Sequence, residues 1–172
     1  MLSEDRQVAE VMACMPYGLY IVGSIGSEGQ NGMMGDWIMQ VSFTPRLLAI
    51  ALENDAQTLA NIRTNCIFSI NFLSESPEGM SLARQFGAPF RASKIGGPAA
   101  LGVHPKLKPG SSHLSPLGAP ILNSSMAWLE CEASQFVPTG DHTLVIAGIT
   151  AGCISSDGAP LTTTFTGWTY SG

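Results

Sequence analysis

The sequence contains few charged residues. Asp, Glu, Lys and Arg make up 12% of the 172 residues, against about 25% in a typical soluble domain, although the hydrophobic content is an ordinary 45%. A surface so poor in charge indicates that another subunit covers part of it. The 8 Lys and Arg against 13 Asp and Glu give a net charge of -5. This balance provides no basic patch for phosphate backbones and argues against nucleic-acid binding.

Long hydrophobic runs are also missing. The longest plainly apolar runs, 47–52 and 144–149, are far shorter than the about 20 residues that span a bilayer, so no membrane segment is predicted. Glu4, Asp5 and Arg6 lie close together near the N-terminus, which does not fit the basic-then-apolar layout of a signal peptide. We therefore expect a cytoplasmic protein.

Cysteine is scarce and scattered. Cys14, Cys66, Cys131 and Cys153 form no C-x-x-C pair and have no zinc-finger spacing, which argues against a structural metal site. Each lies within an apolar segment, so we expect buried, reduced thiols.

Motifs of covalent catalysis and of nucleotide binding are absent as well. The chain contains no G-x-S-x-G, no P-loop and no G-x-G-x-x-G. A domain without these motifs is most simply a cofactor binder, in which the cofactor supplies the reactivity and the protein supplies its position.

Hydrophobic periodicity and turn residues predict a single, mainly β domain over residues 1–172. We expect three helices, at 4–12, 56–65 and 77–86, and seven strands, at 18–25, 33–43, 47–52, 66–73, 121–136, 143–154 and 161–170. Residues 88–120 contain many Gly, Pro and Ser residues and predict a long loop that covers a ligand or a partner. An antiparallel barrel with helices at its ends fits this order best.

The stretch 31–58 organises the rest of the chain. It begins with a glycine-rich turn, continues through two apolar extended runs separated by 42–45, and ends on Glu53-Asn54-Asp55 at a predicted helix start. This order combines an apolar shelf, exposed backbone N–H groups and a helix end that accepts anions. Such a site suits a flat, phosphorylated ligand.

Five segments carry a family resemblance. They are PYGLYIVGS, NGMMGDWIMQVSFTP, TLANIRTNCIFSINFL, LECEA followed by TGDHTLVIAGI, and GWTYSG, in this order between residues 15 and 172. Together they resemble the flavin reductase-like FMN-binding domain, in particular the version that acts beside diiron flavoproteins and rubredoxins. The resemblance implies a split β-barrel that forms a homodimer with FMN near the subunit interface. It also implies reduction of that flavin by NAD(P)H, with electrons passed to free flavin or to a protein acceptor.

The resemblance also assigns candidate site residues. The family's flavin-facing turn and strand fall on 31–36, and its bend falls on 42–46. Its phosphate-contacting residues fall on 51–54 and, at the helix start, on 57 and 58. Its Gly-Asp-His falls on 140–142. His142 is the candidate catalytic residue. The candidate cofactor-binding residues are Met33, Met34, Gly35, Asp36, Trp37, Ser42, Glu53, Asn54, Gln57, Thr58 and Lys94.

The chemistry of these residues agrees in part with the assignment. Backbone N–H groups beside Gly35 can donate to the ring, and methionines and Trp37 offer polarizable apolar cover. The helix start near residue 56 can accept a phosphate, with Asn54 and Thr58 as donors. His142 has an unperturbed pKa of about 6.5 and can steady a reduced flavin or a hydride donor.

Asp36 departs from the family pattern because it adds a carboxylate beside an anionic ligand. An unpaired carboxylate there would reduce affinity, so we expect it to point to solvent or to pair with Arg46 or Lys94.

Other interpretations remain open. Met33 and Met34 can be core filler, and His142 can be a simple turn residue. The protein can be an FMN-binding electron carrier without direct NAD(P)H activity, or a flavin-free interaction module. The sequence does not distinguish NADH from NADPH or FMN from FAD.

Overall fold

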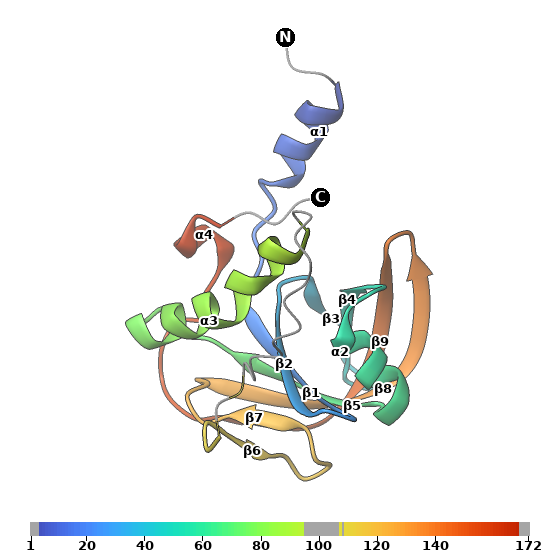
Figure 1. The fold of residues 1–172 in the computed structure, drawn as a ribbon, viewed down its shortest axis with the longest axis vertical. Helices are drawn as coiled ribbons and strands as arrows, with labels where there is room; N and C mark the ends of the chain where they lie inside the picture. The colour runs from blue at the N-terminus through green and yellow to red at the C-terminus, as the bar shows by residue number, and fades with distance from the viewer. Residues whose placement is uncertain (1–3, 95–106, 108, 169–172) are drawn as a thin grey trace.

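The computed structural model describes residues 4–94, 107 and 109–168, and it confirms a mainly β domain (Figure 1). The described residues form four helices: α1 (Glu4–Met12), α2 (Gln57–Asn65), α3 (Pro77–Lys94) and α4 (Thr163–Thr166). They also form nine strands: β1 (Tyr20–Gly26), β2 (Gly29–Gly35), β3 (Ile38–Ser42), β4 (Leu47–Glu53), β5 (Ile67–Phe72), β6 (Ser112–Leu114), β7 (Pro120–Leu122), β8 (Ala127–Thr139) and β9 (His142–Ile154).

Seven strands form one antiparallel sheet in the order β2-β1-β5-β8-β9-β4-β3, and β6 pairs with β7 separately. β2 and β3 follow each other in the chain, yet they form the two opposite edges of this sheet. Within the described ranges no ladder joins them, so the sheet is open where a closed barrel would be continuous. The flavin site that the sequence predicts falls on this opening.

The predicted strand 33–43 is two strands. Asp36 and Trp37 interrupt it, and the N–H of Ile38 donates to the Asp36 carbonyl at 2.9 Å. Gly35 lies at the break, and a Cβ there would be 3.0 Å from Val22 Cγ2. Gly35 thus allows a close approach to the core, while β3 ends in a turn with a cis Thr44-Pro45 bond.

Further predictions were wrong. The helix expected to end at Phe86 continues through Gly87 to Lys94, and Gly87 lies near Met34 of β2. The expected loop 88–120 therefore begins as helix and contains β6, while 95–106 and 108 lie outside the described residues. The expected strand 161–170 contains the short helix α4, whose N-cap Thr162 accepts from the N–H of Phe165.

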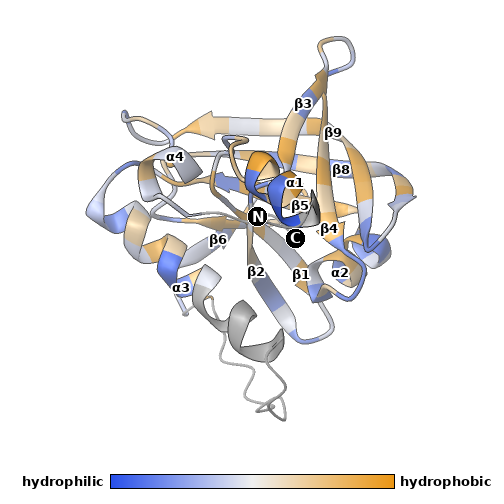
Figure 2. Ribbon diagram, turned by 90° about the horizontal axis from the view of Figure 1, so that it is seen from above, coloured by the Kyte–Doolittle hydropathy of each residue, from blue (hydrophilic) through white to orange (hydrophobic). Residues whose placement is uncertain are grey.

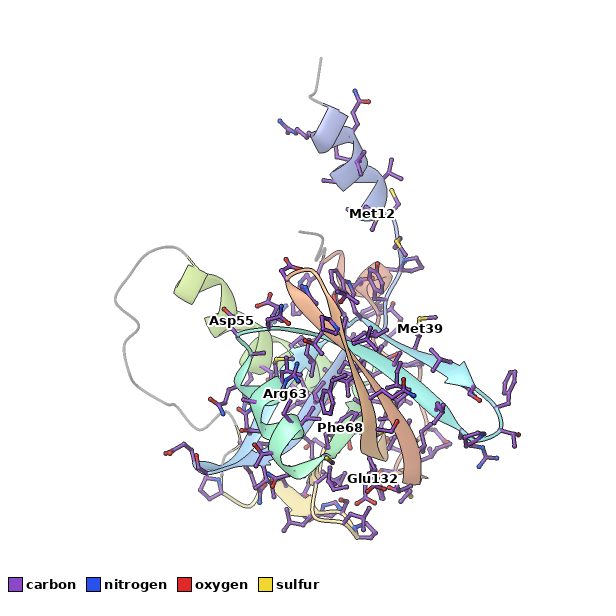
Figure 3. The ribbon with its side chains drawn as sticks, turned by 90° about the vertical axis from the view of Figure 1, so that its right-hand side faces the viewer. Met12, Met39, Asp55, Arg63, Phe68 and Glu132 are labelled. Carbon is purple, nitrogen blue, oxygen red and sulfur yellow. The ribbon has the colours of Figure 1, made fainter. Side chains whose placement is uncertain are left out.

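The core has two parts, one on each face of β1. Val22 belongs to the larger cluster between the sheet and α2, with Phe68 at its centre (Figure 3), and Ile21 belongs to the smaller cluster under α3. This alternation follows from the two-residue period of a strand. Each large aliphatic or aromatic side chain buried here contributes about 1.5–3 kcal/mol.

Buried polar groups also hold the sheet together. The Asn71 amide donates to the Ile21 carbonyl at 3.0 Å and accepts from the Leu122 N–H at 2.8 Å. The Glu130 carboxylate, 1% exposed, accepts from the Leu117 N–H and from the Thr150 hydroxyl, each at 2.7 Å. These contacts attach the segment around β6 and β7 to the large sheet, and Asn71 is a core amide with its hydrogen bonds satisfied.

The cysteines agree with the sequence only in part. Cys131 is buried and Cys66 is half-buried, but Cys14 and Cys153 are exposed. The prediction of a buried thiol was therefore wrong at these two positions, both of which lie at the periphery of the fold.

Helix α1 projects from the body of the domain, and its ribbon carries both hydrophobic and hydrophilic residues (Figures 1 and 2). Val8, Val11 and Met12 are exposed on it. Among the described helices, none combines the length and the apolarity that crossing a membrane requires.

Candidate functional site

The candidate site lies at the opening between β2 and β3. The Asp36-Trp37 link carries the chain from one edge of the sheet to the other, and the Ala51 N–H of β4 donates to the Trp37 carbonyl at 3.1 Å. Neither outer edge has a ladder partner in the part of the chain that the structure describes. Edge strands present backbone donors and acceptors, so a ligand with ring nitrogens and carbonyls can bind here.

Two aromatic rings meet beside this link. The ring centroids of Trp37 and His142 are 4.8 Å apart at an interplanar angle of 38°. Tyr17 lies on Trp37 at 6.5 Å, and Tyr17 is itself fixed because its N–H donates to the hydroxyl of Thr163 at 2.9 Å. Tyr17 was not among the predicted site residues, although the PYG segment was an available signal.

His142 is the first residue of β9 and is 9% exposed. Its Nδ1 lies 2.6 Å from Oδ1 of Asp141, whose side chain is 92% exposed. Asp141 thereby fixes the ring orientation and leaves Nε2 as the nitrogen for contact with a ligand. The structure brings His142 next to Trp37, as the sequence-based site requires.

Asn54 connects the beginning of α2 to the turn before His142. Its Nδ2 donates to the Gly140 carbonyl at 3.0 Å, and its Oδ1 accepts from the Thr143 hydroxyl at 2.8 Å. The Asn54 N–H also donates to the Asp141 carbonyl at 3.0 Å. The amide therefore supports the site, whereas the sequence assigned it to a phosphate.

The start of α2 offers an anion site. Its N-cap residue Ala56 makes no side-chain cap, and the first turn contains no acidic residue. The positive end of a nine-residue helix is thus not neutralised by its own side chains. This observation fits a group that carries a phosphate.

Two predicted phosphate contacts lie in this first turn. Thr58 is buried, and its hydroxyl accepts from Nδ2 of Asn31 on β2 at 2.9 Å. Gln57 is exposed and donates to Oδ1 of Asn61 at 2.8 Å. The Asn31 contact holds the helix start against the strand that leads to Asp36.

Asp36 is half-buried in the link. Burial raises the pKa of its carboxyl from 3.8 to about 6, although backbone N–H groups of Asp36 and Trp37 and the nearby charge of His142 each lower it. Arg46, one expected partner, lies in the turn beyond the far end of β3. Among the described residues, His142 acts on the Asp36 carboxyl and no ion pair joins it to Arg46, so the expectation of a partner at Arg46 was wrong.

The predicted ring-covering residues divide between the two core clusters. Met33 packs against the larger cluster and Met34 against the smaller one. Their contacts favour the interpretation that they fill the core. Gly35 directly precedes the Asp36-Trp37 link, so its backbone lies at the opening between β2 and β3.

Not every predicted residue comes together. Glu53 lies opposite His142, but Ser42 lies opposite Leu47 at the other end of β4, about 20 Å away for a strand of this length. The side chain of Lys94 lies outside the described part of the chain. Asp36, Trp37, Glu53, Asn54 and His142 thus form the compact part of the site. Within the described ranges no group of three or more His, Cys, Asp or Glu residues is placed to hold a metal ion.

Comparison with known proteins gives a consistent result. The family model described as the flavin reductase like domain matches residues 12–169. Diflavin flavoprotein A 1 of Synechocystis is 27% identical over 89% of this chain, which corresponds to 25% of that protein. The flavin reductase (NADH) of Kitasatospora aureofaciens is 27% identical and is covered over 68% of its length, with 83% of this chain aligned.

A solved structure shares the fold. The NADH:FAD oxidoreductase SgcE6 of Streptomyces globisporus superposes with a TM-score of 0.74 and 21% identity, over 92% of this chain and 82% of that one. The chain spans about a quarter of the length of the diflavin relatives that it matches.

Proposed function

The chain belongs to the flavin reductase like domain family, and from this premise we propose that it binds a flavin between β2 and β3 and catalyses its reduction by NADH or NADPH. The observation that carries this proposal is the contact of Trp37 with His142 beside the Asp36-Trp37 link. An apolar ring face, edge backbone groups and an uncapped helix start within one region fit a flat ring with a phosphate.

Each part of the site has a proposed role. Trp37 packs against the flavin ring, and backbone groups around Gly35 bond its polar edge. The α2 start, with Gln57 and Thr58, binds the phosphate. His142 contacts the reacting ring or the nicotinamide through Nε2 because Asp141 occupies Nδ1. The bound flavin supplies the hydride acceptor, and the protein orients it and limits access of water.

We propose FMN as the flavin because α2 offers one uncapped helix start for one phosphate. Family members also act on FAD, as the Streptomyces relative does by its name, so the choice needs a direct comparison. Electrons would pass to free flavin or to a protein acceptor, and the similarity to diflavin flavoproteins supports the second route.

We also propose a homodimer in the cytoplasm. Strand β3 and the turn after it present Met39, Val41 and Phe43 to solvent, with Phe43 85% exposed. Exposed apolar rows of this kind mark contact surfaces, and β3 borders the candidate flavin site. Figure 3 shows Met39 on the outer surface of the domain.

Titration of the purified protein with FMN, FAD and riboflavin, followed by calorimetry, tests the binding. Addition of NADH or NADPH without oxygen, followed by loss of the oxidised-flavin absorbance, tests the reaction. Trp37→Ala should weaken FMN binding by at least tenfold, and His142→Gln should slow reduction, whereas His113→Gln on the exposed strand β6 should change neither.

Each outcome separates the alternatives. Tight FMN binding without nicotinamide oxidation would identify an electron carrier. A flat titration with all three flavins would leave a flavin-free interaction module and would refute the proposal.

A further inference from the structure

Asp36 is an ionisable residue in the link between β2 and β3, the two edges of the sheet. It is half-buried in the link between the edge strands, and the backbone N–H groups of Asp36 and Trp37 donate to its carboxylate. The proposed function does not use this group. Asp36 is also the position at which the sequence departs from the family pattern by adding a carboxylate.

Opposing influences act on the pKa of the Asp36 carboxyl. Burial is the largest influence and raises its pKa to about 6, while the two backbone bonds and the charge of His142 act in the opposite direction. With a pKa of about 6 the carboxyl is mostly ionised at pH 7, so a further rise in its pKa makes it take up a proton there. Loss of the remaining water around it causes such a rise.

The charged groups around Asp36 come from each neighbouring element. β9 contributes His142, and the turn before it contributes Asp141, which lies 2.6 Å from His142 Nδ1. Glu53 at the end of β4 lies opposite His142, and the phenol of Tyr17 lies against Trp37. Asp141 therefore contacts the same histidine that acts on Asp36.

Building on the proposed flavin site, we propose that Asp36 binds one proton when oxidised flavin enters, and that the neutral carboxyl then donates a hydrogen bond to the ring. A ring over the link removes water from the carboxyl, and the flavin phosphate adds negative charge nearby. Both effects favour the protonated form. The polar edge of an oxidised flavin has several acceptors and a single N–H donor, so a donating side chain matches it better than a carboxylate does.

Calorimetric titration with FMN near pH 7 tests this proposal in two buffers that differ in ionisation enthalpy. The wild-type protein should take up close to one proton per FMN bound, and its Kd should rise about tenfold per pH unit above pH 7. Asp36→Asn, which keeps the shape of the side chain, should bind FMN without that uptake and with a nearly constant Kd. His142→Gln tests whether the histidine is the proton acceptor instead: uptake that is lost in this variant but kept by Asp36→Asn overturns the inference.

The possible results are distinct. Failure of the wild-type protein to bind FMN overturns both the proposed function and this inference. FMN binding without proton uptake, or with equal uptake by Asp36→Asn, overturns this inference and leaves the flavin site intact. If Asp36→Asn does not fold, the wild-type uptake and the comparison with Asp36→Ser decide the matter.

Discussion

The hydroxyl of Thr143 donates to Oδ1 of Asn54 at 2.8 Å, across the boundary between β9 and the beginning of α2. The same amide donates to the Gly140 carbonyl. These bonds attach the helix start to the turn that carries His142. The proposed phosphate site and the proposed reacting side chain are therefore positioned by one residue that needs to contact neither ligand.

Asn54→Ala should lower the free energy of unfolding by about 1 kcal/mol, because it removes both side-chain bonds from a partly exposed turn. Urea denaturation measures this change. Gln40→Ala is the control, since its amide is exposed on the edge strand β3 and bonds only locally to the Ser42 carbonyl, and it should stay within about 0.5 kcal/mol. Equal stability of wild type and Asn54→Ala would contradict the positioning role.

Glu130→Gln should lower the free energy of unfolding by about 2 kcal/mol at neutral pH, because the buried donors lose a charged acceptor. Desolvation opposes ionisation here, but bonds from Ser115, Leu117 and Thr150 outweigh it and lower the pKa below its ordinary 4.5. This contribution is complete above about pH 4.5 and disappears as pH falls through the lowered pKa.

The effect of Glu130→Gln is therefore expected to shrink in acid. Denaturation curves at neutral pH and at about pH 4 compare the two proteins. Glu132→Gln is the matched control, since Glu132 is exposed on the same strand (Figure 3). A loss that stays constant across this pH range would show that the charge of Glu130 is unimportant.

Asp36→Asn should raise the melting temperature of the flavin-free protein above pH 6. The folded pKa of about 6 exceeds the ordinary 3.8, so the ionised carboxylate destabilises the fold at neutral pH. As pH falls from about 6 toward 3.8, the folded protein binds its proton first and the advantage of the variant disappears. Thermal scans across this pH range measure the melting temperatures, with the exposed Asp157→Asn as control. A melting temperature of Asp36→Asn no higher than that of the wild type at neutral pH would refute this prediction.

Phe43→Glu should convert a dimer into a monomer. A charge within the exposed row of Met39, Val41 and Phe43 opposes burial of that row against a second copy. Light scattering on the eluted protein should change from twice the 18.1 kDa chain mass to a single mass. Gln40→Glu adds the same charge within β3 but outside this row and should remain dimeric; a monomeric wild-type protein would refute the dimer.

The sequence predicted strands correctly where an apolar run or a turn residue marks them locally. The apolar run 47–52 and the turn at Gly140 correspond closely to β4 and to the β8–β9 hairpin. The break at Asp36 was not predictable, because it depends on the bond from Ala51 to Trp37 between distant segments. The extension of α3 past Gly87 was not predictable either, because a glycine is a common local signal for the end of a helix.

Residue types and the family resemblance predicted which residues belong to the site, but they did not predict how these residues are arranged. Trp37 and His142 were both named from the sequence, but their packing brings together residues far apart in the chain. Asn54 was identified as a polar residue at a helix start, and only the structure shows that Gly140 and Thr143 occupy its amide. Ser42 belongs to the same segment NGMMGDWIMQVSFTP as Asp36, yet β3 separates the two along its full length.

The strand order has a consequence for synthesis of the protein. The β1–β2 and β3–β4 hairpins are made early, but β8 and β9 lie between them in the sheet and are made late. A nascent chain on the ribosome can therefore fold each hairpin but cannot join the two halves until residue 154 has emerged. Because β2 and β3 belong to different halves, the opening proposed to bind the flavin forms only once both halves have joined.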